Sequence, residues 1–119
     1  MKRVFKSFVF ALNGLKDCIL HEKNFQIQFV ISILTVAAGF FLTISKTEWL
    51  VILICFAVVL SLEIINSAIE KLCDLVCPDF NLTIKKVKDM SASAVLFAAI
   101  ISFIIGCIIF LPKIEMMFF

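Results

Sequence analysis

One short segment of the sequence, residues 63–74, holds five polar side chains at spacings that would place them on one face of a helix. They are Glu63, Asn66, Ser67, Glu70 and Asp74. Their offsets of 0, 3, 4, 7 and 11 residues keep them within roughly 100° of arc, because each residue of an α-helix turns by about 100°. The residues between them are mostly Ile, Ala and Leu. The segment is therefore predicted to be a helix that gathers three carboxylates, an amide and a hydroxyl into one polar stripe.

Glu63 lies at the apolar end of this polar stripe. Residues 49–62 before it carry no charge, and the rise of a helix puts Glu63 about 16 Å from Asp74. Ionisable groups inside a membrane span are costly, and they usually face a bundle interior, a cavity or a functional site. A cluster that only packs helices would explain Asn66 and Ser67, but it would leave three carboxylates unexplained. We therefore favour a catalytic function for the stripe.

Two further charged segments, 21–24 (HEKN) and 85–89 (KKVKD), precede apolar stretches. Glu22, Glu70 and Asp74 are candidate ligands of Mg²⁺, which prefers oxygen and often binds together with substrate phosphates. Lys88 is a candidate counter-charge for a phosphate. A metal, a cation and a base are what phosphoryl transfer requires, although the sequence has neither a G-x-x-x-x-G-K-[ST] loop nor a Gly-rich kinase loop.

The composition is that of an integral membrane protein. Apolar residues make up 63% of the 119 residues, against about 45–50% in soluble domains. Three stretches lack charge, 24–45, 49–62 and 90–112. The first and third are long enough to cross about 30 Å of hydrocarbon, whereas the second spans it only if the helix continues to about residue 76. With three Gly, two Pro and no alternating pattern, helices rather than strands are expected.

The N-terminal segment, about residues 2–20, has the pattern of an amphipathic helix lying in the membrane interface. Its apolar residues recur at helical spacing, at Phe5, Phe8, Leu12, Leu15 and Ile19. A secretory signal peptide is the alternative, because a basic start precedes these residues. However, Lys16 and Asp17 interrupt the apolar run and no small-residue cleavage site follows. We therefore favour a surface helix.

Basic residues are distributed unequally between the two ends of the expected spans. Nine lie at one end (Lys2, Arg3, Lys6, Lys16, Lys23, Lys71, Lys85, Lys86 and Lys88), and Lys46 and Lys113 lie at the other. The positive-inside rule places the N-terminus and the polar stripe on the cytoplasmic side. At the opposite end, Ser45 and Glu48 match a capping box that opens the second span, and Trp49 falls at interface depth.

The sequence thus predicts one all-α membrane domain over residues 1–119, with a surface helix and spans at about 25–45, 48–76 and 85–111. Three spans offer few surfaces on which to bury the polar stripe, so an oligomer is expected. The five cysteines form no C-x-x-C pair, so neither a zinc site nor a disulfide framework is expected. We expect no nucleic-acid partner.

The string E-x-x-N-S-A-I-E-x-x-x-D at 63–74, followed by Lys88 and Asp89, resembles the small prokaryotic diacylglycerol kinases, which include the undecaprenol kinases of Gram-positive bacteria. The resemblance covers nearly the whole chain, through Glu22-x-x-Phe25 and T-E-W at 47–49 to the third span. It implies a homotrimer in the bacterial plasma membrane, with composite active sites at the cytoplasmic interface. Gln26 departs from the Arg that the family commonly has there.

The resemblance also implies roles for single residues. Glu63 matches the family's proposed general base for the lipid hydroxyl, and Glu22 and Glu70 match the carboxylates that bind Mg²⁺ with the nucleotide. The other matched residues are near the nucleotide or the transferred phosphate: Asn66, which would also contact the lipid substrate, Lys88, Asp74, Asp89 and, as a further candidate in the surface helix, Arg3.

The leading hypothesis is an ATP- and Mg²⁺-dependent kinase that phosphorylates the hydroxyl of diacylglycerol or undecaprenol, giving phosphatidic acid or undecaprenyl phosphate. The T-E-W sequence at 47–49 favours the undecaprenol branch. One alternative is a proton- or cation-coupled transporter that uses Glu63 as its carrier carboxylate. Another is a non-catalytic membrane assembly subunit. The transporter hypothesis leaves Glu22, Glu70 and the pair of Lys88 and Asp89 without roles.

Overall fold

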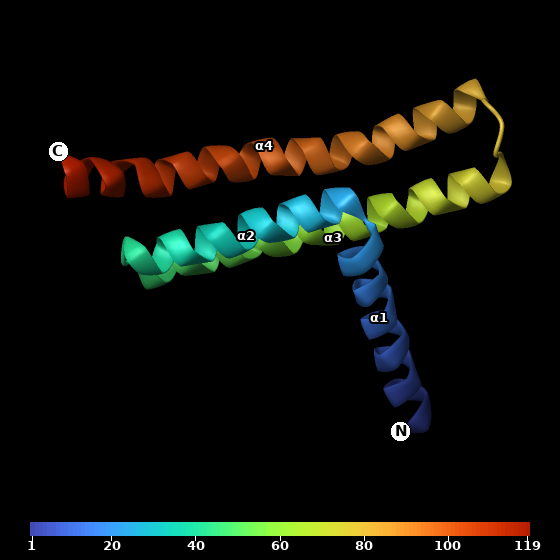
Figure 1. Cartoon of the computed structure of the whole chain (residues 1–119), viewed down its shortest axis with the longest axis horizontal. Coiled ribbons are helices and arrows are strands. Elements are labelled where there is room, and N and C mark those ends of the chain that lie inside the picture. Colours follow the sequence, from blue (N-terminus) through green and yellow to red (C-terminus); the bar gives the residue numbers. More distant parts are fainter.

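The computed structural model describes all residues from 1 to 119, and it consists of four helices without strands. The helices are α1 (Lys2–His21), α2 (Lys23–Phe41), α3 (Lys46–Val76) and α4 (Leu82–Phe118). The last three are each long and apolar enough to cross a membrane. The predicted fold class, an N-terminal helix followed by three membrane-spanning helices, is confirmed. Figure 1 shows α2, α3 and α4 running side by side along the long axis, with α1 projecting steeply away from them.

A single extended residue, Glu22, separates α1 from α2 and sets the sharp change of direction between them. Its backbone has φ −101° and ψ 107°, and its N–H donates to the Cys18 carbonyl at 3.1 Å. The amide of Gln26 donates from Nε2 to the Ile19 carbonyl at 2.9 Å. That bond satisfies one of the carbonyls that the end of a helix leaves without a partner. Gln26 thereby ties the end of α1 to the start of α2.

The α2–α3 turn is tight because Gly39 has no side chain. A Cβ atom at Gly39 would lie 2.7 Å from Cη2 of Trp49, and the Trp49 ring packs against Phe40 with 4.9 Å between centroids. Thr43 takes a left-handed conformation with φ 49°. The indole of Trp49 therefore packs directly on the backbone of α2, and the two helices lie close together at this end.

The start of α3 is fixed by side chains on both sides. The predicted capping box is confirmed: Ser45 Oγ accepts from the Glu48 N–H at 3.2 Å, and the Ser45 N–H donates to Glu48 Oε1 at 2.9 Å. Lys113 of α4 also pairs with Glu48, with Nζ 3.1 Å from Oε1. The Glu48 carboxylate therefore joins the start of α3 to the far end of α4.

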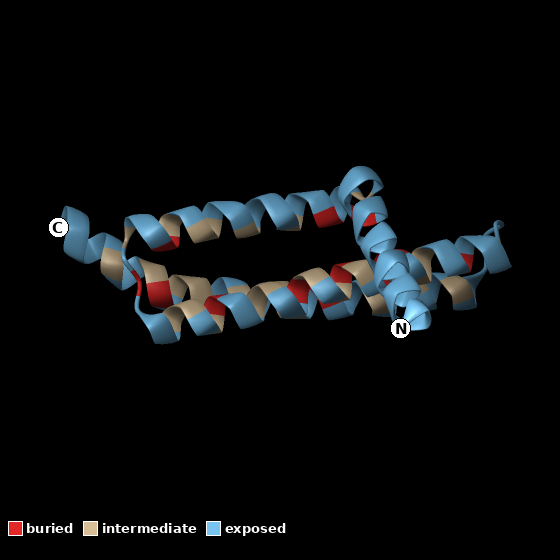
Figure 2. Cartoon of the chain, turned by 90° about the horizontal axis from the view of Figure 1, so that it is seen from below, coloured by how far each residue is buried: buried red, intermediate tan, exposed pale blue.

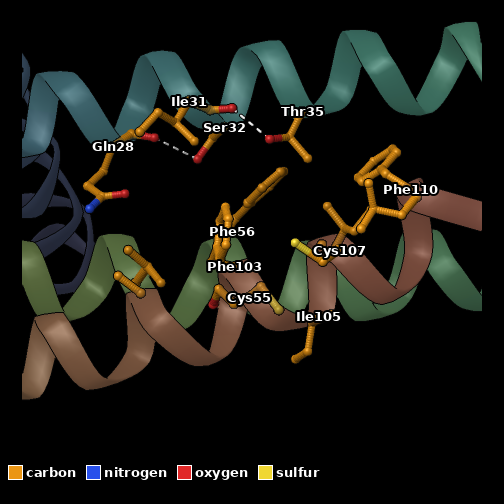
Figure 3. Close-up of a pocket in the computed structure, with 16 residues that line it drawn as sticks. Gln28, Ile31, Ser32, Thr35, Cys55, Phe56, Phe103, Ile105, Cys107 and Phe110 are labelled. Carbon is orange, nitrogen blue, oxygen red and sulfur yellow. Dashed lines mark hydrogen bonds between the residues drawn. The ribbon is translucent and has the colours of Figure 1, made fainter. Parts of the chain in front are cut away.

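The helices pack on α3 as the central element. Both α2 and α4 pack along it, but they do not pack against each other, and between them lies a cavity of about 440 Å³. Figure 3 shows Gln28, Ser32 and Thr35 of α2 facing Phe103 and Cys107 of α4 across this space. Most apolar side chains of α2–α4 are exposed (Figure 2). Such a surface suits a protein that has hydrocarbon or another subunit as its surroundings.

Candidate active site

The polar stripe lies on the second half of α3, and its burial decreases along the helix. Glu63, Asn66 and Ser67 are buried, with 4%, 4% and 6% of their surface exposed, whereas Glu70 is half-buried and Asp74 is exposed. The helical spacing accounts for the shared face. Packing by the neighbouring helices accounts for the gradient, because α3 continues beyond the start of α2 towards the α3–α4 turn (Figure 1). The stripe therefore leads from water into the apolar part of the molecule.

The buried part of the stripe contains two oxygen atoms without a hydrogen-bond partner. They are Oε2 of Glu63 and Oδ1 of Asn66. The Asn66 amide is oriented by its nitrogen, because Nδ2 donates a hydrogen bond to Glu70 Oε1 at 3.3 Å. Leaving a buried acceptor unsatisfied costs about 1–3 kcal/mol, so such atoms call for an explanation. A ligand that supplies a proton donor or a cation to these oxygens would remove the cost.

Glu22 reaches the stripe's helix from the α1–α2 joint. Its carboxylate does not cap α2; instead, Oε1 lies 3.2 Å from Nζ of Lys71 on α3. Lys71 follows Glu70 directly in the sequence, so their backbones differ by about 1.5 Å in height along the helix. The structure thus places the predicted metal-binding carboxylate of Glu22 beside Lys71, the residue that follows Glu70.

Lys88, at the start of α4, faces the water-exposed end of the stripe. Its ammonium donates to Oδ1 of Asp74 at 2.5 Å, across the α3–α4 turn. Asp89, which follows it, points elsewhere and pairs with Lys85 at 2.7 Å. Lys88 and Asp74 are therefore brought together, whereas Asp89 has its partner one turn back on its own helix.

Arg3 is not brought to the stripe within the chain. It lies near the free end of α1, about 28 Å from Glu22 along the helix axis, and α1 points away from α3 in Figure 1. Its side chain makes no ion pair or hydrogen bond. A nucleotide contact from Arg3 would therefore involve a part of the molecule remote from Glu63 and Glu70.

The oxygen atoms around the stripe suit Mg²⁺. Within the chain, no group of three or more His, Cys, Asp or Glu side chains is close enough to hold a metal ion. Mg²⁺ that arrives with a nucleotide needs only one or two protein carboxylates, since phosphates and water complete its octahedron. Glu70, Glu22 and the unpartnered Oδ1 of Asn66 provide ligands of this kind.

Sequence reasoning did not predict the contacts that Lys71 and Gln26 make at the α1–α2 joint. Lys71 has no distinctive sequence context, because a basic residue near the end of a span is ordinary, and Gln26 stands out only as a departure from the family's usual Arg. The only signal for Lys71 was its position next to Glu70 inside the E-x-x-N-S-A-I-E-x-x-x-D string.

Comparison with known proteins relates this arrangement to a family. The sequence model of the prokaryotic diacylglycerol kinases matches residues 9–110. The chain belongs to the prokaryotic diacylglycerol kinase family. The matched region includes Glu22, the entire polar stripe and Lys88, and it begins after Arg3. Membership in a kinase family does not favour the transporter or the assembly subunit.

Individual members of the family are similar over most of their length. The undecaprenol kinase of Bacillus subtilis is 39% identical over 113 residues, which is 95% of this chain and 92% of that protein. The diacylglycerol kinase of Helicobacter pylori strain J99 is 37% identical, over 83% of this chain and 77% of the relative. The diacylglycerol kinase of Escherichia coli K12 is 28% identical, over 90% of this chain and 88% of the relative.

Proposed function

We propose that this membrane-embedded lipid kinase transfers the γ-phosphoryl group of ATP to the hydroxyl of a membrane lipid, with undecaprenol as the favoured substrate. Family membership supports a lipid kinase that uses ATP. The 39% identity to an undecaprenol kinase, compared with 28–37% for the diacylglycerol kinases described above, favours undecaprenol. The observation that carries the proposal is Glu63, a buried carboxylate with a free oxygen on a membrane-spanning helix.

In the proposed reaction, Glu63 is the general base. The lipid hydroxyl attacks the γ-phosphorus of ATP, a new P–O bond forms, and the bond to the departing ADP oxygen breaks. The hydroxyl proton passes to the Glu63 carboxylate. The burial of Glu63 supports this role, because bulk water is largely excluded from its carboxylate and would not compete with the lipid hydroxyl. General-base catalysis of this kind contributes about 100- to 10,000-fold to a rate.

The other residues of the site would position the nucleotide. Glu22 and Glu70 would hold Mg²⁺, which when bound neutralises charge on the phosphates. Asn66, oriented by Glu70 at 3.3 Å, would present Oδ1 to the ligand, and Lys88 would balance negative charge near Asp74. Asp89 and Arg3 would contribute peripheral nucleotide contacts, Arg3 only if α1 of the same or another subunit reaches the site.

We further propose that these groups face the cytoplasm and act within a homotrimer. The orientation is supported by the nine basic residues at this end of the spans. A neighbouring subunit is supported by the many exposed apolar side chains of α2–α4 and by the small number of carboxylates that one chain gathers.

Phosphoryl transfer in lipid nanodiscs tests the proposal. The purified protein would be incubated with labelled ATP, Mg²⁺ and either undecaprenol or diacylglycerol. We expect label in undecaprenol with wild type, and a loss of about 100-fold or more with Glu63→Gln. Glu115→Gln serves as the matched control, because it makes the same chemical change at an exposed residue near the C-terminal end of α4, far from the polar stripe. Label in neither lipid would overturn the kinase function, and label in diacylglycerol alone would overturn the choice of substrate.

A further inference from the structure

Lys71 is a charged residue at the active site for which the proposed reaction has no use. Its ammonium lies 3.2 Å from Oε1 of Glu22, and its side chain is 63% exposed compared with 21% for Glu22. A lysine this exposed has no packing reason to adopt one direction. The contact with Glu22 is therefore what orients it.

The Glu22 carboxylate depends on Lys71 in turn. Glu22 is the extended residue between α1 and α2, and its side chain makes no capping hydrogen bond to α2. Lys71 is its ion-pair partner, and no side-chain hydrogen bond from another residue reaches the carboxylate. Gln26 and Cys18 bond only to the backbone of the joint. Lys71 is thus the one side chain that pairs with the Glu22 carboxylate.

A cation on Glu22 affects how the carboxylate can bind a second cation. The carboxylate has about four acceptor positions, but an ammonium and a divalent metal that share one carboxylate repel each other. The pair itself is weak, because exposed ion pairs contribute about 0.2–1 kcal/mol. Metal bound to a nucleotide can therefore displace Lys71, and Lys71 has room to turn into solvent.

From these contacts we propose that Lys71 is the resting counter-ion of Glu22 and that the metal-bound nucleotide displaces it. The proposal rests on the proposed function, in which Glu22 is a metal ligand. Lys71 pairs with the Glu22 carboxylate and competes with the metal for it. The competition sets the affinity for metal-bound nucleotide and leaves the lipid site untouched.

A binding experiment without turnover tests this competition. Mn²⁺ and a non-hydrolysable ATP analogue are added to the protein in nanodiscs, and electron paramagnetic resonance measures how much Mn²⁺ is bound. We expect Lys71→Gln to bind the metal about 2- to 5-fold more tightly than wild type, as the loss of a competing pair of this strength predicts. Lys71→Arg keeps the pair and should bind as wild type does. Lys86→Gln removes the same charge from an exposed residue of α4 that has no ion-pair partner, and it controls for net charge.

Steady-state kinetics give a second expectation. In Lys71→Gln the KM for Mg·ATP should fall by the same factor, while the KM for lipid stays unchanged. The wild-type protein gives a further test without any mutation. Acetic anhydride modifies exposed lysines, and mass spectrometry measures the rate at each residue. The rate at Lys71 should rise when Mn²⁺ and the ATP analogue displace it from Glu22, whereas the rate at Lys86 should not.

The outcomes separate this inference from the proposed function. If Glu22→Gln binds the metal as tightly as wild type, the metal role of Glu22 is wrong and the proposed site fails. If Glu22→Gln weakens binding but Lys71→Gln behaves like Lys86→Gln or binds more weakly, the role of Lys71 is overturned and the site stands. An unchanged or slower modification of Lys71 in the presence of nucleotide would also overturn it.

Discussion

Lys88 of α4 and Asp74 of α3 form an ion pair across the α3–α4 turn, with Nζ 2.5 Å from Oδ1. The two residues are fourteen positions apart in the sequence, and the pair joins the ends of the two longest helices next to the water-exposed end of the polar stripe. Both side chains are partly open to solvent, at 37% and 67% exposure. The contact therefore contributes little to stability, and it leaves Lys88 able to exchange Asp74 for a phosphate.

We expect Lys88→Ala to lose activity far more than stability. The loss of a cation at the developing phosphate charge should lower kcat about 100-fold or more, while the free energy of unfolding should change by less than about 1 kcal/mol. Asp74→Asn breaks the same pair but keeps Lys88, so it should retain much more activity. Lys86→Ala is the charge control. Kinase assays and unfolding by SDS in mixed micelles measure the two quantities, and equal activity loss in Lys88→Ala and Asp74→Asn would contradict the prediction.

The buried Glu63 should cost the protein stability. Its Oε2 atom lacks a hydrogen-bond partner, and burying a polar or charged group without a partner is unfavourable. Glu63→Gln, which keeps the shape and removes the acid, should therefore unfold at the same or a higher temperature than wild type while losing catalysis. Glu115→Gln, exposed near the C-terminus, should change neither. A lower unfolding temperature in Glu63→Gln would mean that the carboxylate is stabilised by a partner that the single chain does not show.

The contact between Gly39 and Trp49 should make the α2–α3 turn intolerant of any side chain at position 39. Gly39→Ala places a Cβ 2.7 Å from the indole, and forcing an atom into a packed contact costs about 1–3 kcal/mol. Gly14→Ala is the matched control, because nothing lies within 4 Å of a Cβ built there and alanine is favoured over glycine in helices by about 0.5–1 kcal/mol. Gly39→Ala should thus lower the free energy of unfolding and Gly14→Ala should raise it. Shifts of both variants in the same direction would contradict the close packing of Trp49 on Gly39.

Cys18 reports the charges at the α1–α2 joint. Burial raises the pKa of its thiol above the usual value; the carboxylate of Glu22 raises this pKa further, and Lys71 lowers it. Because the thiolate is the reactive form, alkylation of Cys18 should require a higher pH than alkylation of an ordinary thiol. Glu22→Gln should shift the pH–rate profile to lower pH, because it removes a charge that raises the pKa of Cys18. Lys71→Gln should shift the profile to higher pH. Peptide mass spectrometry of iodoacetamide-treated protein measures both, and shifts in one direction would contradict the placement of the two charges.

The sequence by itself determined which residues share a helix face. The polar stripe of Glu63, Asn66, Ser67, Glu70 and Asp74 follows from helical periodicity alone, and so do the capping box at Ser45 and the three apolar stretches that become spans. These features depend on neighbours within about four residues along one helix, and a local pattern is enough to predict them.

Only the tertiary structure decided which charges meet. Glu22 and Lys71 are far apart in the sequence, as are Lys88 and Asp74, and their pairing depends on how the α1–α2 joint and the α3–α4 turn direct the helices. The same holds for Gly39 against Trp49, and for the position of Arg3 away from the stripe. Periodicity fixes the face of a helix on which a residue lies, but the direction of the next helix depends on packing and on single residues such as Glu22 and Gln26. The sequence therefore predicted the candidate catalytic groups, and the fold determined their present partners.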